Sequence, residues 1–240
     1  MSDFNRGYAR TVSADRADMS VDAGLRSFML GVYNKMGLGL LLSAALAWAT
    51  SSIEPVRNLM FGTPLGIVVM FAPLAVLLFA GFAMRNITPR SSGIIYWTVV
   101  SLIGAGLGVL ALVYTRTSIA STFMISASAF GVLSLIGYTT KRDLTGFGSF
   151  LIMGVWGLML AMVVNLFLHS GPMAMLISIA GVGIFAGLTA YDTQRLKLQY
   201  YQLGGDQAAL SVATNYGALS LYLDFINLFQ FLLSLMGSRR

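Results

Sequence analysis

The 240-residue chain contains no cysteine, a single histidine and few charged residues. Without cysteine it forms no disulfides and offers no thiolate metal ligands, so the redox compartment is not indicated by the sequence. The lone histidine, His169, excludes the familiar multi-histidine metal sites. Only 10% of the residues are charged and 57% are hydrophobic, whereas a soluble domain is about 25% charged. Lipid is therefore the expected surroundings of most of the chain.

Long uncharged runs predict seven membrane-spanning helices in one all-α bundle, because a span needs roughly 20 apolar residues. The runs are far too long for the period-two segments of a membrane β-barrel. "HSGP" (169–172) divides the longest run, because Gly-Pro ends a helix. The predicted spans are residues 29–52, 64–84, 93–114, 118–138, 148–168, 173–192 and 213–236.

Three regions follow from these runs. Residues 1–27 alternate arginine and aspartate and lack a cleavable apolar core, which predicts a polar cytoplasmic tail rather than a signal peptide. Residues 28–237 form the transmembrane bundle, and residues 238–240 are a short basic tail. The net charge of +6 comes from residues scattered between apolar runs, which favours membrane topology over nucleic-acid binding.

The positive residues also predict orientation, since cytoplasmic loops are rich in Lys and Arg. With the N-terminus inside, ten fall in inner segments: Arg6, Arg10, Arg16, Arg26, Arg85, Arg90, Lys141, Arg142, Arg195 and Lys197. Four fall in outer segments: Arg57, Arg116, Arg239 and Arg240. Seven crossings would leave the C-terminus outside, and one re-entrant late segment would return it inside.

Two aspartates interrupt apolar runs, Asp192 in "LTAYDTQRLK" and Asp224 in "LSLYLDFINLF". An acid at bilayer depth costs roughly 2.5–3.5 kcal/mol and usually faces a cavity or a partner. The two carboxyl groups can meet only if the loop between their helices lies deeper in the membrane or the helix that carries Asp192 continues beyond that residue. Otherwise Asp192 is an interfacial acid paired with Arg195 or Lys197, and Asp224 is bonded to a tyrosine or asparagine for packing.

Other unusual residues have structural explanations. Lys35 lies near the start of the first span, where we expect its side chain to reach the inner interface. Small residues are dense at Gly104 and Gly108, at Gly183 and Gly187, and in "SASAFG" (126–131). In lipid, such small faces predict close helix packing. "GAGLG" (104–108) has no preceding strand and is not a dinucleotide loop.

"AYDTQRLK" together with "SLYLDFINLFQFLLSLMG" resembles the signature of the Bax inhibitor-1 family. "SFMLGVYNKMGLGLLLSAALA" and "FAMRN" are similar to the family's first span and to the end of its second. The resemblance covers nearly all of the chain after residue 25. It implies a bundle of six or seven helices in which the last helix is central and the others surround it. It also implies a function like that of the family's bacterial members, which are of the pH-sensitive calcium-leak type.

The resemblance also implies roles for single residues. Asp192 and Asp224 would pair as the ion pathway, pH sensor and weak, transient calcium site, and Arg85 would act as a latch on Asp192. Asn227, three residues after Asp224, and Tyr222 would be supporting groups. Two close carboxylates do not both ionise cheaply and tend to share a proton. Asn86 follows Arg85 where bacterial relatives often have further basic residues.

The expected function is therefore a calcium leak in a bacterial inner membrane. Calcium is the expected permeant ion, and no cofactor is expected. One alternative is a non-conducting regulator that binds a membrane protease or channel. Another is a proton-coupled transporter, since paired acids also serve proton relays. An enzyme is not expected, because G-x-S-x-G and H-E-x-x-H motifs are absent and His169 lies in a turn.

Overall fold

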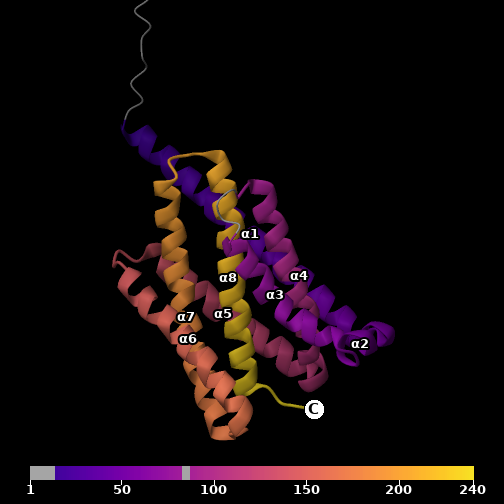
Figure 1. The fold of residues 1–240 in the computed structure, drawn as a ribbon. Helices are drawn as coiled ribbons and strands as arrows, with labels where there is room; N and C mark the ends of the chain where they lie inside the picture. The colour runs from indigo at the N-terminus through magenta and orange to yellow at the C-terminus, as the bar shows by residue number, and fades with distance from the viewer. Residues whose placement is uncertain (1–13, 83–86) are drawn as a thin grey trace, which may run out of the picture.

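The computed structural model describes residues 14–82 and 87–240, and its regular elements in these ranges are helices (Figure 1). The helices are α1 (Ala14–Ser52), α2 (Glu54–Phe61), α3 (Leu65–Phe82), α4 (Pro89–Val113), α5 (Arg116–Thr139), α6 (Thr145–Leu168), α7 (Gly171–Gln202) and α8 (Gln207–Met236). The predicted all-α fold is confirmed. Because α1 begins at Ala14, residues 14–27 of the expected tail are helical.

Seven crossings agree with the helices if one of them is a broken span. Among the described residues, six helices are long and apolar enough to cross a membrane, and α2 and α3 together form a bent seventh. These two helices meet at 72°. The sequence analysis missed α2, whose eight residues include Glu54 and Arg57. Gly62 and Pro64 follow it directly, and such residues interrupt a helix.

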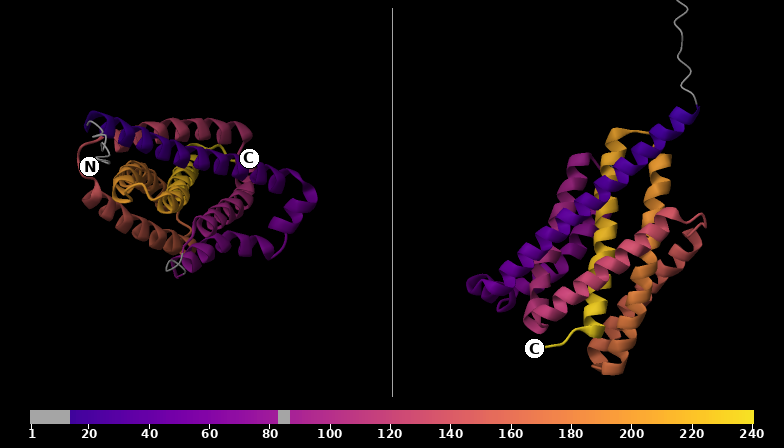
Figure 2. Two further views of the ribbon diagram at one scale, coloured as in Figure 1. Left: turned by 90° about the horizontal axis from the view of Figure 1, so that it is seen from above. Right: turned by 180° about the vertical axis from the view of Figure 1, so that it is seen from behind.

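Helix α8 runs through the centre of the bundle, with α7 beside it (Figures 1 and 2). Seen from above in Figure 2, the other helices surround this pair. Half of the apolar stretch of α8 is buried within the protein, against 11% for that of the outlying α6. The predicted central last helix is thus confirmed.

The outer helices present large apolar side chains to the surroundings. Phe79 on α3, Met153 on α6 and Phe167 on α6 are each more than two-thirds exposed. A soluble protein would not leave so many such residues uncovered. Together with the helix lengths, this makes the chain an integral membrane protein with lipid-facing α3 and α6.

Small residues allow helices to touch, as predicted for Gly104 and Gly108. A Cβ at Gly104 would lie 2.6 Å from the Cα of Ser43, so α1 and α4 pack backbone against backbone there. Thr50 of α1 adds a hydrogen bond from its hydroxyl to the Ala105 carbonyl at 3.0 Å. The prediction was wrong for Gly183, which has open space around it.

The last two helices extend well beyond their predicted ends. Helix α7 continues ten residues past position 192, and α8 begins six residues before position 213. Between them the chain turns at Gly204 and Gly205, whose φ angles of 55° and 88° suit glycine. Asp206 then caps α8 by accepting from the backbone N–H groups of Ala208 and Ala209. Asp192 is therefore well inside a helix rather than at its end.

A close contact between α5 and α7 predicts a stability difference between two glycines of α5. A Cβ at Gly137 would lie 2.1 Å from the Ala190 carbonyl oxygen, whereas a Cβ at Gly131 would meet nothing within 4 Å. Overpacking costs about 1–3 kcal/mol, so Gly137→Ala should lower the melting temperature by about 2–10 °C. Thermal unfolding of the purified protein in detergent measures this.

Gly131→Ala is the matched control and should be neutral or slightly stabilising, because alanine is the better helix former. Equal melting temperatures for the two variants would contradict the backbone contact between α5 and α7.

Candidate functional site

Asp192 is buried between α7 and α8, with only 7% of its surface exposed. The hydroxyl of Ser220, on α8, donates a hydrogen bond to its Oδ2. The guanidinium of Arg195, one turn further along α7, lies 3.8 Å from its Oδ1. This carboxyl group therefore has one hydrogen-bond donor and one positive charge beside it.

Asp224 lies on the central helix and is 5% exposed. Its carboxyl group lies close enough to the Asp192 carboxyl for the two groups to interact electrostatically. Its Oδ2 has no hydrogen-bond partner among the described residues. The structure thus brings together the two acids that the sequence analysis singled out, because α7 runs past Asp192.

The two carboxyl groups differ in their surroundings. Asp192 receives a hydroxyl donor and a nearby cation, both of which favour a charged carboxylate. Asp224 lies in the bundle core, where the next residue, Phe225, and Leu228, one turn further along α8, are almost fully buried. Two neighbouring carboxyl groups do not both ionise cheaply, so the pair is suited to sharing a single proton.

Neither basic neighbour along α7 pairs with Asp192 strongly. Arg195 does lie against Asp192, as one alternative from the sequence expected, but its side chain is 62% exposed. Exposed ion pairs contribute little because water screens them. Lys197 instead donates to the Tyr138 carbonyl at 3.1 Å and lies over the Tyr138 ring.

Tyr222 and Asn227, the expected supporting groups, do not hydrogen-bond to the pair within the described residues. The Tyr222 hydroxyl is 2.7 Å from that of Ser43, on α1. Asn227 donates its side-chain amide to the Leu223 carbonyl of its own helix at 2.8 Å. Tyr222 therefore joins α8 to α1. Arg85, the expected latch, lies outside the described residues.

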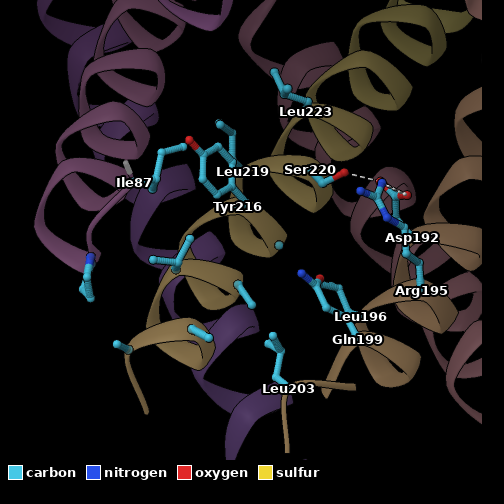
Figure 3. A pocket seen from close by; sticks show the side chains of 16 residues that line it. Ile87, Asp192, Arg195, Leu196, Gln199, Leu203, Tyr216, Leu219, Ser220 and Leu223 are labelled. Carbon is cyan, nitrogen blue, oxygen red and sulfur yellow. Dashed lines mark hydrogen bonds and ion pairs between the residues drawn. The ribbon is translucent and has the colours of Figure 1, made fainter. Parts of the chain in front are cut away.

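A cavity of about 700 Å³ reaches Asp192 from the end of the bundle where α7 and α8 are joined (Figure 3). Its polar lining is Asp192, Arg195, Gln199, Tyr216 and Ser220. The remaining lining is mostly apolar and includes Ile87 and Pro89 at the start of α4. Asp224 does not line the cavity, so Asp192 is the member of the pair that the cavity reaches.

Ser220 is the site residue that the sequence analysis missed. It precedes Asp224 by four residues and so lies on the same face of α8. That spacing was a usable signal, because a hydroxyl one turn away from a buried acid is well placed to donate to a neighbouring acid. Tyr216, a further turn earlier, extends the same face into the cavity.

The site does not resemble a resident metal centre. Among the residues that the structure describes, no group of three or more histidine, cysteine or acidic side chains could hold a metal ion. Calcium takes six to eight oxygen ligands. Two carboxyl groups supply at most four, so water and backbone carbonyls would have to complete the shell.

Known proteins match almost the whole chain. A family model described as "Inhibitor of apoptosis-promoting Bax1" matches residues 25–240. A protein of Caulobacter vibrioides is 63% identical over the full length of both chains. A Rickettsia prowazekii protein is 46% identical over 97% of this chain and 98% of its own. The inner membrane protein YbhL of Escherichia coli K12 is 41% identical over 91% of this chain and 94% of its own.

The contact between Ser220 and Asp192 predicts a measurable coupling between α7 and α8. Hydrogen bonds to charged groups contribute about 1.5–3 kcal/mol. Ser220→Ala should therefore lower the melting temperature by about 3–10 °C. The loss should shrink when Asp192→Asn is already present, as a double-mutant cycle by thermal unfolding would show.

Ser178 and Ser234 provide the matched cycle, because their hydroxyls join the same two helices at 3.0 Å without a charge. Polar pairs of this kind in membranes average about 0.6 kcal/mol. Additive effects of Ser220→Ala and Asp192→Asn would show that the hydroxyl does not stabilise the carboxylate.

Proposed function

The chain belongs to the Bax inhibitor-1 family of integral membrane proteins, and from this premise we propose that it is a pH-sensitive calcium-leak channel. The buried aspartate pair is its ion-binding and proton-binding element. The observation that supports this proposal best is the position of Asp192, which lies beside the Asp224 carboxyl and also lines the cavity.

A leak channel needs a site that attracts an ion and then releases it. A lone carboxylate in a low-dielectric bundle attracts a divalent cation strongly, because water screens it little. The incomplete ligand set keeps binding weak, which favours release over storage. Family resemblance and geometry support the same two residues.

Protons compete with calcium at such a pair. Protonation of the pair removes negative charge and weakens the attraction for a cation. In the proposed mechanism Arg85 acts as a latch that neutralises Asp192 when the channel is shut, and loss of this ion pair frees the carboxylate. The resemblance alone supplies the role of Arg85, which lies outside the described residues.

The proposed location is a bacterial inner membrane with a cytoplasmic N-terminus. The printed description of Escherichia coli YbhL is "inner membrane protein". The start of α1, the start of α4 and the α7–α8 loop lie at the same end of the bundle, away from the C-terminus (Figure 1). The excess of Lys and Arg in the segments assigned to the inside favours placing this end in the cytoplasm.

This orientation predicts the behaviour of fused reporters. Seven crossings place Arg240 outside, so a phosphatase that works only outside the cytoplasm should be active when fused after Arg240. The same enzyme fused before Met1 should be inactive, whereas green fluorescent protein should fluoresce there. Phosphatase activity at the N-terminus, with none at the C-terminus, would reverse the proposed topology.

Calcium flux into liposomes that hold only the purified protein tests the function. Asp192→Asn should lower the flux at pH 7 by about tenfold, because losing about 1.4 kcal/mol of ion attraction corresponds to that factor. Asp224→Asn should flatten the response between pH 5 and pH 8, since the pair no longer shares a proton. Arg85→Ala should raise the flux at pH 7 several-fold, because the latch is lost.

Asp143→Asn is the control, because Asp143 is an exposed acid in the α5–α6 loop, apart from the cavity. Its flux should stay within twofold of the parent protein. Unchanged flux and pH response in all three site variants would contradict the proposed roles of the aspartate pair and Arg85. If the pure protein carries no flux and crosslinking recovers a membrane protease or channel, the non-conducting regulator replaces the leak channel. Solute accumulation against its own gradient would favour the transporter.

A further inference from the structure

Lys35, which the sequence analysis expected to reach the inner interface, contacts side chains of two other helices. Its ammonium group turns into the bundle and donates a hydrogen bond to the side-chain oxygen of Asn215, on α8. The same ammonium lies 5.3 Å from the ring centre of Tyr96 and 5.9 Å from that of Trp97, both on α4. No carboxylate pairs with Lys35 among the described residues. A lysine within a span that binds a neutral amide calls for a specific explanation.

The Lys35 contact fixes the orientation of the Asn215 amide. Because Oδ1 accepts from a cation, the Nδ2 group must face the other way, toward α4. There it donates to the Ser92 hydroxyl at 2.7 Å and to the Pro89 carbonyl at 3.1 Å. Asn215 is 5% exposed, so little water competes for these bonds. One buried amide thereby joins three helices.

A second contact ties the same part of α1 to α4. The Tyr96 hydroxyl donates to the backbone carbonyl of Lys35 at 2.7 Å. A Cβ at Gly39, one turn further along α1, would lie 2.2 Å from that hydroxyl. The absence of a side chain at Gly39 is therefore needed for this contact. Lys35 is held at both its backbone and its side chain.

These contacts end at the wall of the cavity that reaches Asp192. Pro89, whose carbonyl accepts from Asn215, lines the cavity together with Ile87. On α8, Ala213 and Tyr216 flank Asn215 and also line the cavity. Figure 3 labels Ile87 and Tyr216 among the residues that line this space. The polar contacts thus hold one wall of the cavity, at the start of α4, against the opposite wall on α8.

We propose that Lys35, Asn215, Ser92 and Pro89 form a clamp that sets the width of the cavity mouth and so limits access to Asp192. Lys35 is a positioning residue in this clamp, because it orients the amide that holds α4. The proposal gives a role to a charged residue that the aspartate pair does not use. Its consequence for ion conduction rests on the proposed function, whereas its consequence for access to the cavity does not.

A single introduced thiol reports on that access, because the chain has no cysteine of its own. Leu223 lines the cavity and lies two turns further along α8 than Asn215, beyond Ser220. The purified Leu223→Cys protein in lipid vesicles is treated from both sides with a water-soluble ammonium methanethiosulfonate. With the clamp intact the thiol should react slowly. Adding Lys35→Met should raise the rate at least fivefold, because the amide is free to turn away from Pro89.

Two further variants separate orientation of the amide from simple packing. Lys35→Arg keeps a donor and a charge and should restore a rate within twofold of the intact clamp. Asn215→Asp keeps an acceptor for Lys35 but has no N–H for Pro89 or Ser92, so it should react as fast as Lys35→Met. It also provides the test if Lys35→Met does not fold.

Ser178→Ala is the control for general loosening, since it removes a hydroxyl contact with Ser234 at the other end of α8. Its thiol should react within twofold of the intact clamp. The clamp is wrong if Lys35→Met and Asn215→Asp leave the rate unchanged in folded protein, or if Ser178→Ala raises it equally.

Calcium flux through the same variants, without the reporter thiol, separates the two proposals. Lys35→Met and Asn215→Asp should raise the flux several-fold at pH 7. If thiol reactivity rises while the parent protein and every variant carry no flux, the clamp stands and the leak channel fails. If the parent protein conducts and neither reactivity nor flux changes in the variants, the clamp fails and the leak channel stands.

Discussion

The burial of two carboxyl groups in a lipid-embedded bundle is the constraint on which the rest of this structure depends. A carboxylate within a span must find a donor, a cation or water, because lipid offers none of them. Asp192 finds the Ser220 hydroxyl and the cavity, and Asp224 finds Asp192. Both solutions require α7 and α8 to lie side by side along the centre. The other helices then surround these two helices (Figure 2).

Hydroxyl groups and glycines hold that surrounding layer in place. Apolar burial gives little driving force between helices in lipid, so close packing and interhelical hydrogen bonds replace it. The Ser43 hydroxyl illustrates both, since it donates to the Val100 carbonyl at 3.2 Å and contacts the Tyr222 hydroxyl. Gly104 allows the α1 backbone to approach at the same place. The polar residues buried in this bundle therefore do not all belong to the ion site.

The sequence predicts the spans well and the contacts between them less well. Uncharged runs locate α3 to α6 within a few residues, because lipid demands length and apolarity from each helix. They do not locate the end of α7, because its last turns are polar and leave the apolar run. The continuation of α7 beyond Asp192, to Gln202, decides whether Asp192 and Asp224 meet. The contact of Lys35 with Asn215 could not be predicted for a similar reason. Hydropathy indicates how deep a residue lies in the membrane, but it does not indicate which side chain of another helix lies beside it.

The shut part of the proposed pathway lies beyond the aspartate pair rather than at it. Asp192 lines the cavity, whereas Phe225 and Phe229, further along α8, lie in the core and do not line it. The ring of Phe123 packs edge-on against both of them, and that of Phe130 against Phe225. A hydrated ion cannot cross such an aromatic layer without leaving its water, so the layer itself resists conduction. In the proposed channel, titration of the pair would open a path only if it also moved α8 against α5, which carries Phe123 and Phe130. The aspartates would then act as the sensor, and the aromatic contacts between α5 and α8 as the barrier.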